Sequence, residues 1–170
     1  MIIEIQKLPP QGMKISEDFE FISSELVEQE AVFLDSVHSK AEIKKIGDKI
    51  IIRGEIKTRL NLLCSRCLSP FDYPIISSFD LIYLPVEKFE LKEELEIEDL
   101  ENLFYANDQI DLKQIILDQL NLSIPLKPLC SEECQGLCPI CGQELKNGQC
   151  GCEVDSVDPR LQKLTFFLKK

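Results

Sequence analysis

The sequence predicts an α+β protein with an antiparallel β-meander that forms a barrel-like sheet, a few helices and a Cys-rich C-terminal segment. Three observations lead to this prediction. Apolar and polar side chains alternate over residues 50–62, apolar side chains recur at helical spacing over residues 111–122, and six of the eight cysteines lie in residues 130–152. We therefore expect an antiparallel β domain over residues 1–128 and a Cys-rich segment over residues 129–170.

The strands of the meander are predicted from the first half of the chain. Residues 2–5, with the sequence IIEI, are typical of a short first strand, and residues 71–86, FDYPIISSFDLIYLPV, are typical of a later one. The dipeptide Gly47-Asp48 indicates a tight turn before the alternating run. Pro74 predicts that the later strand begins irregularly or lies at a sheet edge, because proline cannot donate to a central ladder.

The remaining segments are less regular. Residues 15–30 suit either a strand edge or a short helix, and both alternatives stay open. Residues 86–105 form an acidic insert. The predicted helix at 111–122 follows a plausible N-cap at Asp111, and a final helix is expected from Asp158, which precedes a proline.

The composition is that of a globular protein. Hydrophobic residues make up 44% and charged residues 29% of the chain, and the net charge is −11. No apolar run reaches the roughly 20 residues that a membrane helix needs, and the first residues do not resemble a signal peptide. We therefore expect a cytoplasmic protein without membrane contact. In that reducing compartment cysteines bind metals or catalyse more often than they form structural disulfides.

The eight cysteines form four close pairs with the spacings C-x2-C, C-x3-C, C-x2-C and C-x-C. Four pairs match two tetrahedral four-cysteine sites, so we expect two zinc ions. One site is expected to be a compact C-terminal ribbon made by Cys138, Cys141, Cys150 and Cys152. The other is expected to dock the Cys-rich segment onto the sheet through Cys64, Cys67, Cys130 and Cys134.

Two other roles for the cysteines remain open. An iron–sulfur cluster also accepts four cysteines, and a dithiol redox centre could form at Cys64 and Cys67, with Arg66 lowering the pKa of a thiol. Catalysis is not expected, because we find no nucleophile–base set, phosphate-binding glycine loop or paired-carboxylate motif. The single histidine, His38, is expected to be a surface or sheet residue. We expect neither enzymatic activity nor a small-molecule substrate.

Several motifs, in order, resemble a known family. CSRCLSPF is followed by a helix beginning with IDL, then by IPLKPLCSEECQGLCPICGQEL, CGCE and DPRLQKL. These motifs cover roughly residues 50–168 and are similar to those of the YceD-type large ribosomal RNA subunit accumulation proteins. The resemblance implies a non-enzymatic role in the accumulation or processing of 23S rRNA and in large-subunit assembly. It also implies a link to the zinc-ribbon ribosomal protein L32.

Three functional hypotheses follow. In the first, a ribosome assembly factor meets rRNA phosphate through basic residues on a strand and near the C-terminus: Lys49, Arg53, Lys57, Arg59, Arg160 and Lys163. Its acidic segment 87–101 would then meet a basic ribosomal protein, or shield the basic face when no RNA is present. In the second, the net charge of −11 favours a zinc-stabilised adaptor that never touches RNA. In the third, the thiols form a redox sensor.

Overall fold

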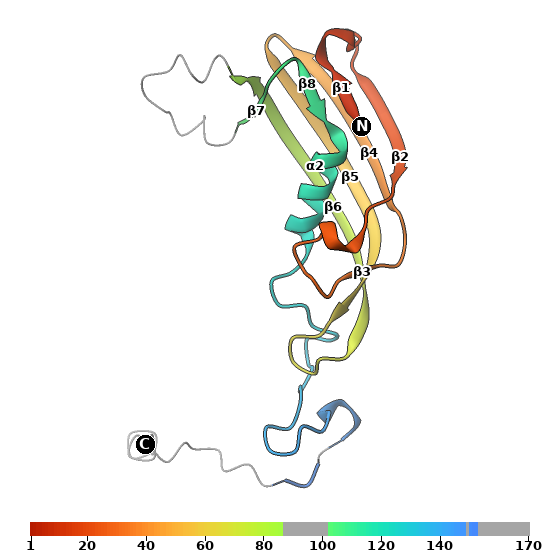
Figure 1. The fold of residues 1–170 in the computed structure, drawn as a ribbon, viewed down its shortest axis with the longest axis vertical. Helices are drawn as coiled ribbons and strands as arrows, with labels where there is room; N and C mark the ends of the chain where they lie inside the picture. The colour runs from red at the N-terminus through yellow and green to blue at the C-terminus, as the bar shows by residue number, and fades with distance from the viewer. Residues whose placement is uncertain (87–101, 149, 153–170) are drawn as a thin grey trace, which may run out of the picture.

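The structure is a computed structural model that describes residues 1–86, 102–148 and 150–152 (Figure 1). Most of the acidic insert predicted at 86–105 lies outside these residues. The predicted C-terminal helix lies outside them as well, together with Arg160 and Lys163. No helix of the described residues is long and apolar enough to cross a membrane.

The main sheet has six strands, and its central part is the predicted antiparallel meander. The strand order is β2-β4-β5-β6-β7, and β3 pairs with β5. All pairs are antiparallel except β6–β7, which is parallel. The strands are β2 (Met13–Phe19), β3 (Val32–Phe33), β4 (Val37–Ile46), β5 (Lys49–Leu63), β6 (Pro70–Pro85) and β7 (Leu103–Tyr105).

The alternation in β5 is confirmed as the signature of a strand with one buried face. Its even-numbered apolar side chains are fully buried: Ile50, Ile52, Ile56, Leu60 and Leu62. The tight turn is also confirmed, since Ile46 pairs with Lys49 across a Gly47 whose φ is 62°. Burying this row of side chains is the main stabilising contribution of the strand.

A second layer covers the buried face of the sheet (Figure 1). It consists of the ladder between β1 (Ile2–Glu4) and β8 (Gln109–Asp111), a 3-10 turn η1 (Ile5–Lys7) and helix α2 (Leu112–Ser123). The apolar face of α2 joins the same core as β5, through Leu112, Ile115, Ile116, Leu117 and Leu120. The predicted helix and its cap are confirmed, because the Asp111 side chain accepts a hydrogen bond from the Lys113 amide at 3.0 Å.

The barrel-like closure expected from the sequence is wrong, because the sheet is open. Its terminal strands β2 and β7 do not pair with each other, and β1 belongs to a separate two-stranded sheet with β8. The physical reason is that α2 and the β1–β8 ladder bury the inner face, so the core is enclosed without pairing the two edges. Segment 15–30, for which a strand edge and a short helix both stayed open, contains neither an α-helix nor a strand beyond β2. It begins with the second part of the edge strand β2 and continues through the 3-10 turn η2 (Ser23–Glu25) and irregular chain.

The position of Pro74 follows from this open topology. Within the described residues β6 pairs with β7 only over Tyr83–Pro85, so the part that contains Pro74 is a sheet edge, as predicted. Strands β5 and β6 are the longest in the sheet, and Figure 1 shows the Cys-rich residues, in blue, beyond the end where these two strands connect. The sheet thereby carries Cys64 and Cys67 to the Cys-rich segment.

Candidate metal centres

The fold gathers all eight cysteines into two groups of four. In each group the sulfur atoms lie within 4.8 Å of one another. The groups have the memberships expected from the sequence: Cys64, Cys67, Cys130 and Cys134 form the first centre, and Cys138, Cys141, Cys150 and Cys152 form the second. Residues more than sixty positions apart therefore share the first centre.

The sulfur separations in the first centre suit a tetrahedral ion. The Sγ atoms of Cys64 and Cys134 are 3.7 Å apart, and those of Cys67 and Cys130 are 3.8 Å apart. Four sulfurs at the Zn–S distance of about 2.3 Å form a tetrahedron with edges of about 3.8 Å. A disulfide would need about 2.05 Å. The donor set is therefore arranged as four separate ligands.

The two C-x2-C pairs adopt the same local turn. The Leu68 amide donates to the Cys64 carbonyl at 2.8 Å, and the Gly142 amide donates to the Cys138 carbonyl at 2.9 Å. The residue after each pair is left-handed, with φ of 59° at Leu68 and 73° at Gly142. The glycine marks the second turn in the sequence. Leu68 carries no such mark, and the equivalence of the two turns is visible only in the structure.

Arg66 fastens the first turn to the segment after α2. Its Nη1 donates to the carbonyl oxygens of Glu132 and Cys134 at 3.0 and 2.8 Å. Nearby, the Ser65 amide donates to the Pro128 carbonyl at 2.8 Å. The sequence suggested Arg66 only as a group that lowers the pKa of a thiol. In the structure its guanidinium instead links the β5–β6 loop to the backbone of residues 132–134, a role that no feature of the sequence indicates.

The second centre lies in a small ribbon that also touches the β5–β6 loop. Leu137 and Glu144 form an isolated bridge, and the Cys138 amide donates to the Gln143 carbonyl at 2.8 Å. The Ser69 hydroxyl donates to the Glu144 carboxylate at 2.8 Å. The ribbon is therefore held both by its own backbone and by the loop that carries the first centre.

The two centres differ in exposure. In the first, Cys64, Cys67 and Cys134 are buried and pack with Leu129 and Leu137. In the second, only Cys138 is buried, and Cys141 is exposed. The first centre is thus part of a small core, whereas the second faces solvent.

The surroundings of the cysteines favour a bound cation. Burial raises the pKa of Cys64, but hydrogen bonds from nearby backbone amides lower it by a larger amount, so the resulting pKa is about 6. The amides of Cys141 and Ile140 lower the pKa of Cys138 to about 6. Burial and the neighbouring thiols raise the pKa of Cys130 to about 12. Four thiolates this close repel one another, so full ionisation of a centre requires a cation among them. Four sulfurs without other donors suit Zn²⁺.

The expected RNA-binding cations on β5 lie on the exposed face of the sheet, but most are already paired. Arg53 Nε lies 2.7 Å from Asp80 Oδ2, and Arg59 Nε lies 2.6 Å from Asp35 Oδ2. Lys57 pairs with Glu55. Lys49 makes no ion pair with any residue that the structure describes. The basic strand is therefore largely neutralised by carboxylates.

His38 lies on β4, away from both centres. Its Nδ1 is 2.7 Å from Asp18 Oδ1 on the neighbouring strand β2. The expectation of a sheet residue is confirmed.

Comparison with known proteins assigns the chain to a family. The family model described as large ribosomal RNA subunit accumulation protein YceD matches residues 52–168. An uncharacterized protein of Mycobacterium tuberculosis (strain ATCC 25618 / H37Rv) is 30% identical over 128 residues, which are 74% of this chain and 59% of that protein. The chain thus spans about three-fifths of that relative's length.

Two other relatives extend the comparison. An uncharacterized Bacillus subtilis protein, YlbN, is 26% identical over 99% of this chain and 95% of its own length. A Zea mays protein named large ribosomal RNA subunit accumulation protein YCED homolog 1, chloroplastic, is 25% identical over 68% of this chain and 48% of its own length. No solved structure matches the chain significantly.

Proposed function

We propose, because the chain belongs to the YceD family of large ribosomal RNA subunit accumulation proteins, that it is a non-enzymatic ribosome biogenesis factor that promotes 23S rRNA accumulation and processing. The observation that carries this proposal is the family match over residues 52–168, which spans all eight cysteines of the two centres. The names of the maize and Arabidopsis thaliana relatives point to the same process.

In this proposal two zinc ions have a structural role. The first would be held by the cysteines of the first centre and would clamp the β5–β6 loop to the segment after α2. The second would be held by the cysteines of the second centre and would close the ribbon. A four-sulfur zinc site has no open position for a substrate, so its contribution is cohesion, on the order of 10 kcal/mol for a small fold.

The proposed partners are 23S rRNA or its precursor and a basic ribosomal protein, L32, in the cytoplasm. The chain carries a net charge of −11, and eight thiolates with two Zn²⁺ would make it more negative. Such a charge speeds and orients the encounter with a basic protein. It also requires any RNA contact to be confined to a local basic area.

Depletion of the protein from its own cells tests the proposal. We expect 23S rRNA to fall relative to 16S rRNA, with 23S precursors persisting and large subunits reduced in sedimentation profiles. Re-expression of the wild-type chain should restore 23S rRNA. Unchanged ratios of 23S to 16S rRNA after depletion would overturn the proposed function.

A zinc-stabilised adaptor that does not touch RNA is the second candidate. The pairing of Arg53, Lys57 and Arg59 with carboxylates favours it. This alternative would be established if the purified protein bound the ribosomal protein but did not bind 23S rRNA fragments at any salt concentration. A redox sensor requires a thiol that reacts in the metal-loaded protein, so complete resistance to alkylation until a chelator is added would exclude it.

A further inference from the structure

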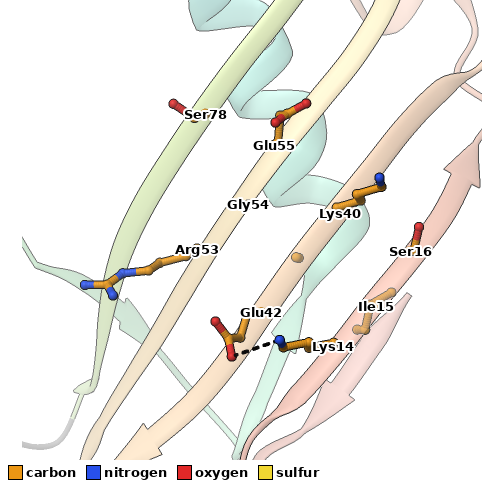
Figure 2. A pocket seen from close by; sticks show the side chains of 10 residues that line it. Lys14, Ile15, Ser16, Lys40, Glu42, Arg53, Gly54, Glu55 and Ser78 are labelled. Atoms are coloured by element: carbon orange, nitrogen blue, oxygen red, sulfur yellow. Dashed lines mark ion pairs between the residues drawn. The ribbon is translucent and has the colours of Figure 1, made fainter.

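The exposed face of the main sheet carries rows of side chains that run across four strands (Figure 2). The strand register places Lys14, Glu42, Arg53 and Asp80 in one row. The next row is Ser16, Lys40, Glu55 and Ser78. Opposite charges that face each other across strands stabilise such a sheet. The rows would be electrically neutral if every cation had its own carboxylate.

At the end of the face near the β4–β5 turn the cations outnumber the carboxylates. Lys14 and Lys44 share one carboxylate oxygen of Glu42, at 3.9 and 3.0 Å. Lys49, beside the turn, makes no ion pair with any described residue, and neither does Lys40, which lies farther along the face, opposite Glu55. The Lys14 side chain is 82% exposed, and Lys40 and Lys49 are exposed too. This end of the sheet therefore has unneutralised positive charge.

Toward the other end of the same face the balance reverses. Lys57 and Arg59 are occupied by Glu55 and Asp35. Asp72 faces Asn61 and adds a further carboxylate beside Arg59. A polyanion would be repelled here unless it displaced existing ion pairs. Of the cations expected on β5, Lys49 alone makes no ion pair with a described residue, whereas Arg53, Lys57 and Arg59 are occupied.

A depression of about 550 Å³ lies on this face over the rows of Arg53 and Glu55, lined by residues of β2, β4, β5 and β6. Figure 2 shows the cations Lys14, Lys40 and Arg53 and the carboxylates Glu42 and Glu55 around it, with the short side chains of Ser16 and Ser78 on the outer strands. Each of these carboxylates also pairs with a lysine outside the lining, Lys44 or Lys57. Gly54 contributes backbone to its lining, and a side chain at this position would point to the buried face, against Phe79. The depression gives a phosphate room to approach both the free ammonium groups and the serine hydroxyls.

We propose that the exposed face between Lys14, Lys40 and Lys49, which includes the depression beside Lys14 and Lys40, binds the phosphodiester backbone of RNA. The proposal rests on the proposed function and assigns its RNA contact to these three lysines rather than to Arg53, Lys57 and Arg59. Lys40 lies six residues along β4 from Ile46, the partner of Lys49, so the surface spans roughly 20 Å at about 3.3 Å per residue. That length accommodates several successive phosphates. No aromatic side chain lines the depression, so the binding is independent of base sequence.

Two charge-matched variants test the proposal. The first is Lys14→Gln/Lys40→Gln/Lys49→Gln, and the second is Lys7→Gln/Lys57→Gln/Arg59→Gln, which removes the same formal charge from paired positions outside the depression. Binding of zinc-loaded protein to single-stranded 23S rRNA fragments and to polyuridine is measured between 0.05 and 0.5 M salt, values chosen to span roughly a decade of screening. Circular dichroism and zinc content verify that both variants are folded.

We expect the first variant to lower the salt slope of binding by about 2, because each phosphate contact with single-stranded RNA contributes about 0.7. The second variant should keep the slope close to that of the wild type. Equal losses in the two variants, or a larger loss in the second, would overturn the assignment. Absence of wild-type binding would overturn it too.

Complementation separates this inference from the proposed function. In depleted cells, the wild-type chain should restore 23S rRNA and the first variant should not. This result would support both the proposed function and the RNA-binding surface. A first variant that binds RNA and restores 23S rRNA as well as the wild type overturns the surface and leaves the function standing. Depletion without any effect on 23S rRNA overturns the function whatever the binding data show.

Discussion

Gly136 lies directly against the backbone of Arg66. A Cβ atom on Gly136 would be 2.9 Å from the Arg66 carbonyl oxygen, and the φ of Gly136 is 77°. The same Arg66 donates through its side chain to the carbonyls of Glu132 and Cys134. The two backbone segments that build the first centre therefore touch at a position where only glycine fits.

The replacement Gly136→Ala is expected to loosen the first centre. It adds both left-handed strain and a clash with backbone, which together cost about 1–3 kcal/mol. Zinc affinity of the first centre and resistance to proteolysis should both fall. Gly47→Ala is the matched control, because Gly47 has a φ of 62° but nothing within 4 Å of the added Cβ. Equal stability loss in the two variants, with zinc retained in both, would contradict this account.

Cysteine replacements should remove the metals one at a time. Cys67→Ser is expected to release one metal per chain and to undock the Cys-rich segment from the β5–β6 loop, because Cys67 faces Cys130 across the two segments. Cys138→Ser should release the other metal and expose mainly the ribbon to protease. Elemental analysis and limited proteolysis report both effects. The grouping of ligands is wrong if each single variant still binds two metals.

Asp111 is expected to make stability depend on acid pH. Burial raises the pKa of Asp111, but the Met1 ammonium group and the amides of Lys113 and Gln114 together lower it by a larger amount. The resulting pKa is below 3.8. A carboxyl with a lowered folded pKa stabilises the protein above its unfolded pKa, and this contribution is lost as the pH falls through the folded value.

Two substitutions at Asp111 separate the cap from its charge. Asp111→Ala should cost about 1 kcal/mol at pH 7 through the lost cap. Asp111→Asn should keep most of the cap but remove the charge, so its deficit relative to wild type should shrink as the pH falls below 3.8. Urea unfolding from pH 7 to pH 3 measures both variants. A constant Asp111→Asn deficit across that range would refute the role of the charge.

Ser39 and Thr58 should respond oppositely to loss of the hydroxyl. Both are buried, but the Ser39 hydroxyl has no hydrogen-bond partner among the described residues, whereas Thr58 Oγ1 donates to the Asp35 carbonyl at 3.1 Å. Ser39→Ala should be neutral or stabilising, and Thr58→Val should destabilise by about 0.5–1.5 kcal/mol. Chemical denaturation measures both, and a clear loss of stability in Ser39→Ala would show that its hydroxyl is satisfied.

The parts of the fold that follow from local patterns were predictable. The buried row of β5, the Gly47 turn and the α2 cap at Asp111 each depend on residues a few positions apart. The spacing of the cysteine pairs likewise restricts how two ligands from one turn can reach a metal. The grouping of the pairs was also expected, because the compact ribbon leaves Cys64 and Cys67 with only Cys130 and Cys134 as partners.

The sequence by itself determined the strand alternation, the helix and the eight sulfur ligands, because each is encoded by side-chain type at short, regular spacing. The tertiary structure alone decided that the sheet is open, that Arg66 crosslinks backbone and that Arg53 and Arg59 are neutralised by Asp80 and Asp35. These outcomes depend on which strands become neighbours and in what register. A cation that has no evident partner in the sequence can thus be paired in the fold. Lys40, by contrast, makes no ion pair with a described residue, because Glu55, which lies opposite it, pairs with Lys57.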